Sequence, residues 1–301
     1  MSRAWTWYVI VLVALNVLGC AWLLYVNRKA KVKPGQAGEP VGHEFDGIEE
    51  LNNPLPAWWT WLFVLTIGFS VVYLARYPGL GSFAGTLGWT SSEQWEGQIA
   101  QAKSQYGPIY ARYFEQSIPD LLNERPAVEM GGRLFASNCS TCHGSDARGG
   151  DGYPNLTDGD WLYGGAPETI VQTITLGRNG MMPPLGAAIG GEPGIKQVAQ
   201  YVLSLSGRPH DAQLAEQGKV HFMAICAACH RPDGTGNPVV GAPNLTDGIW
   251  LHGGRVTDIE DRVRNGKISM MPAHGEILEP EKIHLLALYV YSLSNSPDTG
   301  D

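Results

Sequence analysis

The sequence predicts a mainly α-helical protein in which two N-terminal transmembrane helices precede two tandem copies of one small domain. Three observations lead to this fold class. Two long uncharged apolar runs lie within the first 77 residues, a basic segment separates them, and residues 126–301 contain one set of motifs twice. A chain of 301 residues is long enough for this arrangement.

The first apolar run extends from Trp5 to Val26 and the second from Ala57 to Ala75, without a charged residue in either. Each run is long enough to cross a hydrocarbon core of about 30 Å. Tryptophan and tyrosine stand at both ends of each run, where such rings favour the lipid headgroup region. We therefore expect transmembrane helices at residues 1–27 and 57–77.

Two processing signals compete with the first transmembrane helix. A cleaved signal peptide fits poorly, because the apolar run is too long and lacks a small-residue cleavage site. Lipoprotein processing at Cys20 also fits poorly. Hydrophobicity continues to Val26, and the basic residues follow the run instead of preceding it.

The segment 28–56 between the two runs contains four basic residues: Arg28, Lys29, Lys31 and Lys33. Basic loops remain in the cytoplasm, so everything after the second helix is expected in the periplasm or its equivalent. Residues 78–125 are then expected to form a periplasmic linker with one or two helices over Glu93–Gln116, opened by a capping box at Thr90–Glu93. Neither span contains an ionisable residue, so neither resembles a proton path.

The remainder of the chain, residues 77–301, has 15 basic and 24 acidic residues and hence a net charge of −9. This acidity argues against a nucleic-acid partner. It favours encounter with a protein that carries a basic patch, although it also serves solubility.

The soluble part repeats four features in the same order at offsets of 87 to 89 residues. They are Cys139–His143 with Cys226–His230, Pro154–Gly159 with Pro243–Gly248, Met181–Pro183 with Met270–Pro272, and Tyr201–Ser206 with Tyr289–Ser294. We therefore expect two domains, residues 126–208 and 209–301.

Each copy reads as a first helix, a cysteine motif, loops, and a last helix over Ile195–Leu205 or Ile283–Leu293. Gly131 and Phe135, and likewise Gly218 and Phe222, precede the cysteine motifs at helical spacing. We expect each glycine to let the first and last helices cross closely, with the aromatic ring beside the crossing.

The two C-x-x-C-H motifs are the attachment pattern of c-type haem. Cys139 and Cys142, and likewise Cys226 and Cys229, would form thioethers with the haem vinyl groups. His143 and His230 would then bind the two irons. A thioredoxin-like redox pair would need a βαβ context, which the sequence lacks, and a zinc site would need four ligands from two motifs that the repeat keeps apart.

A sixth iron ligand is expected from the Met-Met-Pro sequence of each copy, because Met/His ligation raises the reduction potential for electron transfer. The methionines next to proline, Met182 and Met271, are the favoured ligands, presented from an irregular loop. Met181 and Met270 are the alternatives. The sequence leaves open whether His143 pairs with Met182 or with Met271.

Several residues are candidates for a secondary role around the haems. Pro154 and Pro243 are expected to offer a carbonyl to the iron-bound histidines. Trp161, Trp250, Arg178 and Arg264 are candidates for haem propionate contacts. The histidines outside the motifs are expected to be surface or packing residues: His43, His210, His221, His252, His274 and His284.

With these features together, the chain resembles the dihaem subunit of cbb3-type cytochrome c oxidases, the CcoP or FixP family. The resemblance rests on two N-terminal helices, the stretch from His43 to Trp59, the sequence Tyr77–Gly81 and the tandem haem motifs. It implies two tandem cytochrome c domains, two covalently bound haems c and a place in the bacterial inner membrane.

The resemblance also implies an electron-entry role. Donor c-type cytochromes would reduce the haems. Electrons would then pass to a monohaem cytochrome subunit and to the catalytic haem–copper subunit, which reduces oxygen to water and pumps protons. The chain itself would have no catalytic residue and, besides these subunits, would contact membrane lipid. Two alternatives remain: a stand-alone dihaem cytochrome serving another respiratory enzyme, and a peroxidase-like dihaem enzyme with one open iron.

Overall fold

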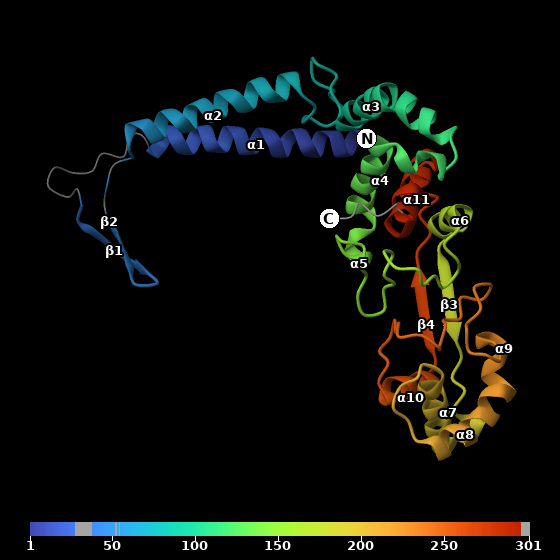
Figure 1. Cartoon of the computed structure of the whole chain (residues 1–301). Coiled ribbons are helices and arrows are strands. Elements are labelled where there is room, and N and C mark those ends of the chain that lie inside the picture. Colours follow the sequence, from blue (N-terminus) through green and yellow to red (C-terminus); the bar gives the residue numbers. More distant parts are fainter. Residues whose placement is uncertain (28–37, 52, 54, 296–301) are drawn as a thin grey trace. The chain divides into compact units, whose positions relative to one another are not determined.

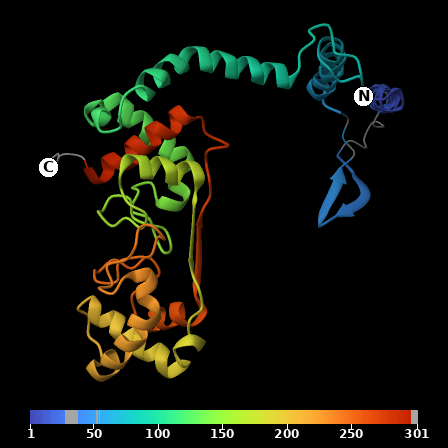
Figure 2. The same cartoon turned by 90° about the vertical axis from the view of Figure 1, so that its right-hand side faces the viewer.

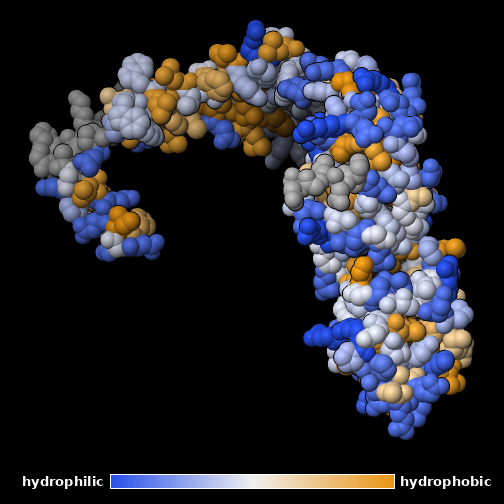
Figure 3. All heavy atoms as spheres, viewed as in Figure 1, coloured by the Kyte–Doolittle hydropathy of each residue, from blue (hydrophilic) through white to orange (hydrophobic). Residues whose placement is uncertain are grey.

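The computed structural model describes residues 1–27, 38–51, 53 and 55–295, and these form two compact units, residues 1–105 and 106–301. The first unit opens with α1 (Arg3–Asn27), which packs against α2 (Ala57–Arg76). Both helices are long and apolar enough to cross a membrane. Almost none of their side chains is buried, and apolar residues cover them in Figure 3. Both spans agree with the sequence prediction.

Between the two helices lies an antiparallel hairpin of β1 (Pro40–Phe45) and β2 (Ile48–Leu51). The basic residues 28–33, which carried the orientation argument, lie outside the described residues. After α2, the helix α3 (Ser91–Phe114) begins where the sequence predicts. The Thr90 hydroxyl accepts a hydrogen bond from the Glu93 backbone N–H at 3.1 Å, which caps that helix.

The second unit contains the two repeats. After a short turn, η1 (Asp120–Asn123), the first repeat comprises α4 (Arg125–Asn138), α5 (Ser140–His143), α6 (Pro167–Leu176), β3 (Arg178–Met182), η2 (Ala187–Ile189) and α7 (Glu192–Leu205). The second comprises α8 (Ala212–His221), η3 (Phe222–Cys226), α9 (Ala227–His230), α10 (Val256–Asn265), β4 (Lys267–Met271) and α11 (Pro280–Asn295). The first and last helices of both copies agree with the sequence prediction.

The middle of each repeat is more regular than the sequence indicates. A helix, α6 or α10, and a strand, β3 or β4, stand where loops were expected. The two methionine segments are therefore strands, and the expectation of an irregular loop is wrong. Each strand pairs with the strand of the other repeat. The sequence of one repeat taken alone therefore does not predict either strand.

The helices of the two repeats are exchanged (Figures 1 and 2). The last helix of the second repeat, α11, packs on α4 and α6, whereas α7 packs on α8 and α10. A Cβ atom at Gly131 would overlap the carbonyl oxygen of Leu285 in α11, and one at Gly218 would overlap that of Gln197 in α7. The glycine crossings exist as expected, but each joins helices of different repeats.

The aromatic residues follow the same exchange. Phe135 packs against Tyr289 with ring centroids 5.2 Å apart, and Phe222 packs against Tyr201 at 5.1 Å. Two separate apolar cores result. The first joins α4, α6 and α11 with the end of α3, and the second joins α7, η3 and α10.

The strands β3 and β4 form the link between these cores. They pair antiparallel, with Arg178 opposite Met271 and Lys267 opposite Met182. Beyond the strands, the Leu185 N–H donates to the Val263 carbonyl, and the His274 N–H donates to the Ile174 carbonyl, each at 3.0 Å. These two bonds are 89 residues apart in sequence, so the crossing is nearly two-fold symmetric.

Candidate functional site

The cysteine motifs lie at the ends of the first helices of the repeats. Cys139 directly follows α4 and is partly buried, and Cys226 ends η3 and is buried, whereas Cys142 and Cys229 are exposed. Burial, followed by the neighbouring cysteine, raises the pKa of Cys139 and of Cys226 to about 11. Redox pairs and zinc sites need thiolates, which these surroundings disfavour.

The two motif histidines make the same backbone contact. His143 Nδ1 lies 3.2 Å from the Pro154 carbonyl oxygen, and His230 Nδ1 lies 3.1 Å from that of Pro243. A carbonyl only accepts, so Nδ1 carries the proton and Nε2 keeps a free lone pair. Burial lowers the pKa of both imidazoles, which keeps them neutral. Each ring is thus held as a ligand whose orientation is fixed by the chain.

The strands sort the four candidate methionines into two classes. Because successive side chains of a strand point to opposite faces, Met181 and Met182 cannot face the same way. Met181 and Met270 are 74% and 71% exposed, whereas Met182 and Met271 point inward and pack on the apolar cores. The inward residues are the two that precede proline, as the sequence analysis favours.

Each inward methionine approaches the core of the other repeat. Met271 packs on the first core, together with Cys139, and Met182 packs on the second core, which contains Cys226. His274, three residues beyond Met271, lies close enough to His143 to add to the lowering of its pKa, after the larger effect of burial. The structure therefore brings Met271 to the side of His143 and Met182 to the side of His230.

The candidate propionate residues differ between the repeats. The Arg178 guanidinium stacks on Tyr163, 4.7 Å from the ring centroid, and its Nε donates to Thr173 Oγ1. Arg264 instead forms a two-bond ion pair with the exposed Glu192, at 2.7 and 2.8 Å. The expectation for Arg264 therefore gains no support.

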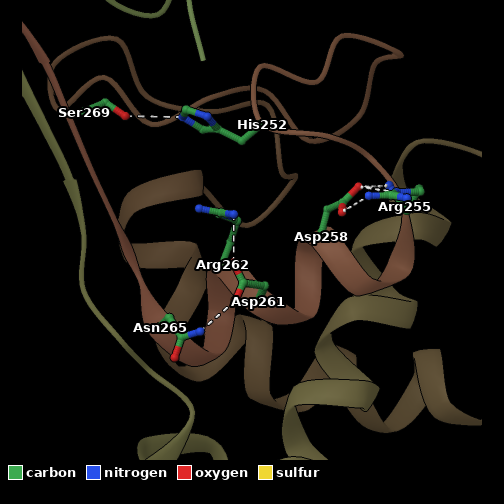
Figure 4. A network of polar contacts seen from close by, with 7 residues as sticks. All are labelled: His252, Arg255, Asp258, Asp261, Arg262, Asn265 and Ser269. Carbon is green, nitrogen blue, oxygen red and sulfur yellow. Dashed lines mark hydrogen bonds and ion pairs between the residues drawn. The ribbon is translucent and has the colours of Figure 1, made fainter. Parts of the chain in front are cut away.

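Two buried N–H groups of the second repeat have no partner among the described residues: Trp250 Nε1 and Arg262 Nε. Figure 4 shows Arg262 on α10 with Asp261 beside it and His252 across from it. Sequence reasoning missed Arg262. The first repeat has Thr173 at the matching position, so a search for residues shared by the two repeats gives no signal for Arg262.

The remaining histidines make local contacts. His252 Nε2 lies 3.3 Å from Ser269 Oγ, His221 contacts Gln197, and His210 and His274 contact nearby carbonyls. His284 packs edge-on against Phe114, and His43 is exposed. Across the described ranges, no three His, Cys, Asp or Glu side chains gather as a metal cluster.

The residues fit a covalently bound haem in each half of the second unit. Each half offers two thiols, one of them at the surface, a neutral imidazole and an inward thioether from a paired strand. The unpartnered N–H groups of Trp250 and Arg262 supply buried donors for a carboxylate, which a haem propionate provides. No protein group accepts from these two donors in the part of the chain described.

Comparison with known proteins assigns both parts of the chain to models of cbb3-type oxidase subunits. Residues 37–84 match the model of the N-terminal domain of cytochrome oxidase-cbb3, FixP. Residues 126–202 and 213–290 each match that of cytochrome c oxidase, cbb3-type, subunit III.

Curated relatives match over almost the whole chain. A cbb3-type oxidase subunit CcoP from Rubrivivax gelatinosus is 50% identical over 98% of this chain and 96% of its own length. A FixP subunit from Sinorhizobium medicae is 39% identical over 85% and 94%. A CcoP subunit from Cereibacter sphaeroides is 38% identical over 88% and 98%.

Proposed function

Because the chain belongs to the CcoP/FixP family, subunit III of cbb3-type cytochrome c oxidases, we propose that it carries two covalently bound haems c and no catalytic residue of its own. As a member, it is an electron-transfer subunit of an oxidoreductase complex. The observation that carries the two-haem proposal is the duplicated set of exposed thiol, neutral imidazole and inward methionine. A bound haem supplies the one-electron Fe(III)/Fe(II) couple.

The ligands of each haem come from both repeats. Cys139, Cys142 and His143 would hold the first haem, with Met271 from the second repeat as sixth ligand. Cys226, Cys229 and His230 would hold the second haem, with Met182 from the first repeat. The packing of Met271 beside Cys139, and of Met182 on the core of Cys226, supports this crossed pairing.

The chain's own residues hold both ligand sets rigid. The Pro154 and Pro243 carbonyls fix the imidazole tautomers, and the β3–β4 pairing fixes the two methionines relative to each other. With a histidine and a methionine as ligands, each iron would have no open position for oxygen or peroxide. That arrangement suits electron transfer and opposes the peroxidase-like alternative.

Orientation and partners follow from the membrane helices. With the basic segment 28–33 in the cytoplasm, residues 78–301 would lie in the periplasm. Donor c-type cytochromes would meet the haem domains there. Electrons would continue to the monohaem subunit and then to the catalytic haem–copper subunit.

The function is tested by purifying the tagged full chain from native membranes in mild detergent. We expect c-type haem at two per chain, b-type haem from the catalytic subunit, and oxygen uptake with an artificial donor. Deletion of the chain should abolish donor-dependent oxygen uptake. A preparation with c-type haem alone, under several detergents, would contradict the oxidase assembly.

The crossed ligation is tested in chains that carry one haem. In a Cys139→Ala/Cys142→Ala background only the His230 haem remains, and Met182→Ala should open its iron to carbon monoxide, whereas Met271→Ala should not. The Cys226→Ala/Cys229→Ala background should give the reverse. Met181→Ala is the matched control, because that side chain points outward. The opposite pattern of carbon monoxide binding would establish ligation within each repeat.

A further inference from the structure

The β1–β2 hairpin carries features that neither electron transfer nor membrane anchoring uses. Every residue of both strands is exposed, including Phe45 at 66% and Ile48 at 72%. The turn between the strands is Asp46–Gly47 with φ of 52° and 82°, the left-handed pair that a two-residue hairpin turn requires. The sequence thus specifies a hairpin that buries nothing within its own unit.

The pairing register fixes which side chains of the hairpin share a face. Glu44 stands directly opposite Glu49, and Phe45 stands opposite Ile48. Directly opposite residues share a face, and neighbours along a strand alternate, so the two glutamates and the two apolar residues lie on opposite faces. By the same alternation Leu51 shares the face of the two glutamates and Glu50 shares the face of Phe45 and Ile48, so both faces carry carboxylates beside exposed apolar side chains.

Such a hairpin is unfavourable alone. Two-stranded hairpins are marginal in water, and like charges directly opposite each other destabilise the pair. Glu39, Asp46 and Glu50 bring the acidic residues of 39–51 to five, with no Lys or Arg among them. Among the described residues, none of these five carboxylates is in an ion pair with a basic side chain. A basic partner would relieve the repulsion, and the free strand edges offer it backbone groups.

We propose that the β1–β2 hairpin docks on the basic cytoplasmic rim of a membrane-embedded subunit of the same oxidase. The inference rests on the proposed orientation, which puts residues 28–56 in the cytoplasm. Cytoplasmic loops of membrane proteins carry an excess of Lys and Arg, so charge complementarity selects this partner. Anionic lipid headgroups would be repelled by the five carboxylates.

The orientation is tested first, with Asp46→Cys at the hairpin turn in a Cys20→Ser background. A membrane-impermeant maleimide should label this cysteine in inverted membrane vesicles and not in intact spheroplasts. Labelling of spheroplasts would overturn the proposed topology, and the docking proposal with it.

Docking is tested in the full complex with Glu44→Lys/Glu49→Lys. We expect a roughly tenfold loss of b-type haem recovered per c-type haem, because like charges would now face each other across the interface. The c-type haem per tagged chain and the membrane insertion should not change. Glu96→Lys/Glu115→Lys is the matched control: it makes the same charge change at exposed positions outside the hairpin.

A photoreactive phenylalanine at position 45 identifies what the hairpin touches. Capture of another oxidase subunit, lost in Glu44→Lys/Glu49→Lys, is the expected result. Capture of lipid or of this chain alone, together with an unchanged haem ratio in the charge-reversed variant, would overturn the proposal. The labelling result at position 46 does not depend on docking. Failure of the docking proposal would therefore leave the proposed topology intact.

Discussion

The two repeats share the order of their main helices, one methionine strand each and one set of iron-ligand candidates. Among the positions at which they differ, three lie in or near the methionine strands and change the polar groups there. The first repeat has Tyr163, Thr173 and Arg178, and the second, 89 residues later at each place, has His252, Arg262 and Lys267. The shared residues carry the proposed haem ligands and the crossing. The differing residues change the charge within each half, and so make the two halves unequal.

The equivalent contacts show this in detail. Tyr163 packs over Gly241 of the second repeat, and His252 lies at the matching place beside Gly152 of the first. Arg178 is satisfied by Thr173 and by the Tyr163 ring. In the second repeat the Arg262 Nε is left without a partner, while Lys267 and Arg262 both lower the pKa of His252, after the larger effect of burial. The second half therefore has more uncompensated cationic groups than the first, and it is better suited to hold an anion such as a carboxylate.

The largest effect is expected from blocking the exchanged helix crossings. Gly131→Ala places a methyl group against the backbone carbonyl of Leu285, which cannot move away. Overpacking of this kind costs about 1–3 kcal/mol of folding free energy. Because α11 follows Met271 in the chain, the His143 haem should bind carbon monoxide in this variant. Thermal unfolding and ferrous carbon monoxide spectra in the single-haem backgrounds measure both outcomes.

The control for that substitution lies in α3. Gly97 has no atom within 4 Å of an added Cβ, so Gly97→Ala should leave both haems closed and stabilise its helix by about 0.5–1 kcal/mol. Gly218→Ala should act on the His230 haem, because its crossing is with α7. If Gly131→Ala opened the His230 haem instead, the exchange of helices would be refuted.

A smaller effect is expected from Arg262→Gln, which removes a cation of the second half. The reduced haem carries one positive charge less than the oxidised haem, so a nearby cation stabilises reduction. We expect the midpoint potential of the His230 haem to fall by tens of millivolts, where about 60 mV corresponds to a tenfold change for one electron. The His143 haem should not change. A redox titration followed by haem absorbance, in each single-haem background, measures both midpoint potentials.

Arg264→Gln is the matched control, because that guanidinium is paired with Glu192 at the surface. Equal shifts of both haems in Arg262→Gln would indicate a general structural loss. The same shift in Arg264→Gln would indicate only a long-range charge effect.

Much of this architecture could be predicted from the sequence, because periodic helices and a duplicated motif are local signals. The exchange of the last helices between the repeats is harder to predict. The last helix of either repeat, α7 or α11, has an apolar face that could pack on α4 or on α8. One signal for it existed. Only six residues, 206–211, separate α7 from α8, and a connection this short favours antiparallel neighbours. Once α7 packs on α8, α11 is left for α4 and α6.

The strands and Arg262 were missed for a related reason. β3 and β4 are five residues each, and their hydrogen bonds come from a strand 89 residues away, so no local pattern predicts them. Met182 and Met271, which the sequence favours as iron ligands because proline follows each of them, are the two methionines that pack inward, and their ligation stays a prediction. Arg262 lacks a counterpart in the first repeat, and a search for shared residues passes over such positions.

The smallest expected effect is a pH dependence at the contact between His252 and the first repeat. The pKa of His252 is lowered by burial, then by Lys267 and Arg262, and is raised slightly by Asp151. A histidine with a lowered folded pKa stabilises the fold fully above its unfolded pKa of 6.5, and this stability is lost as pH falls below that value. The haem unit should therefore unfold at lower temperature in mild acid.

His252→Tyr, which installs the residue of the first repeat, should reduce that pH dependence of the unfolding temperature. His210→Tyr, at an exposed position, should not reduce it. An identical pH slope in His252→Tyr and in the unchanged chain would assign the acid sensitivity elsewhere, with the half-buried His284 as the next group to replace.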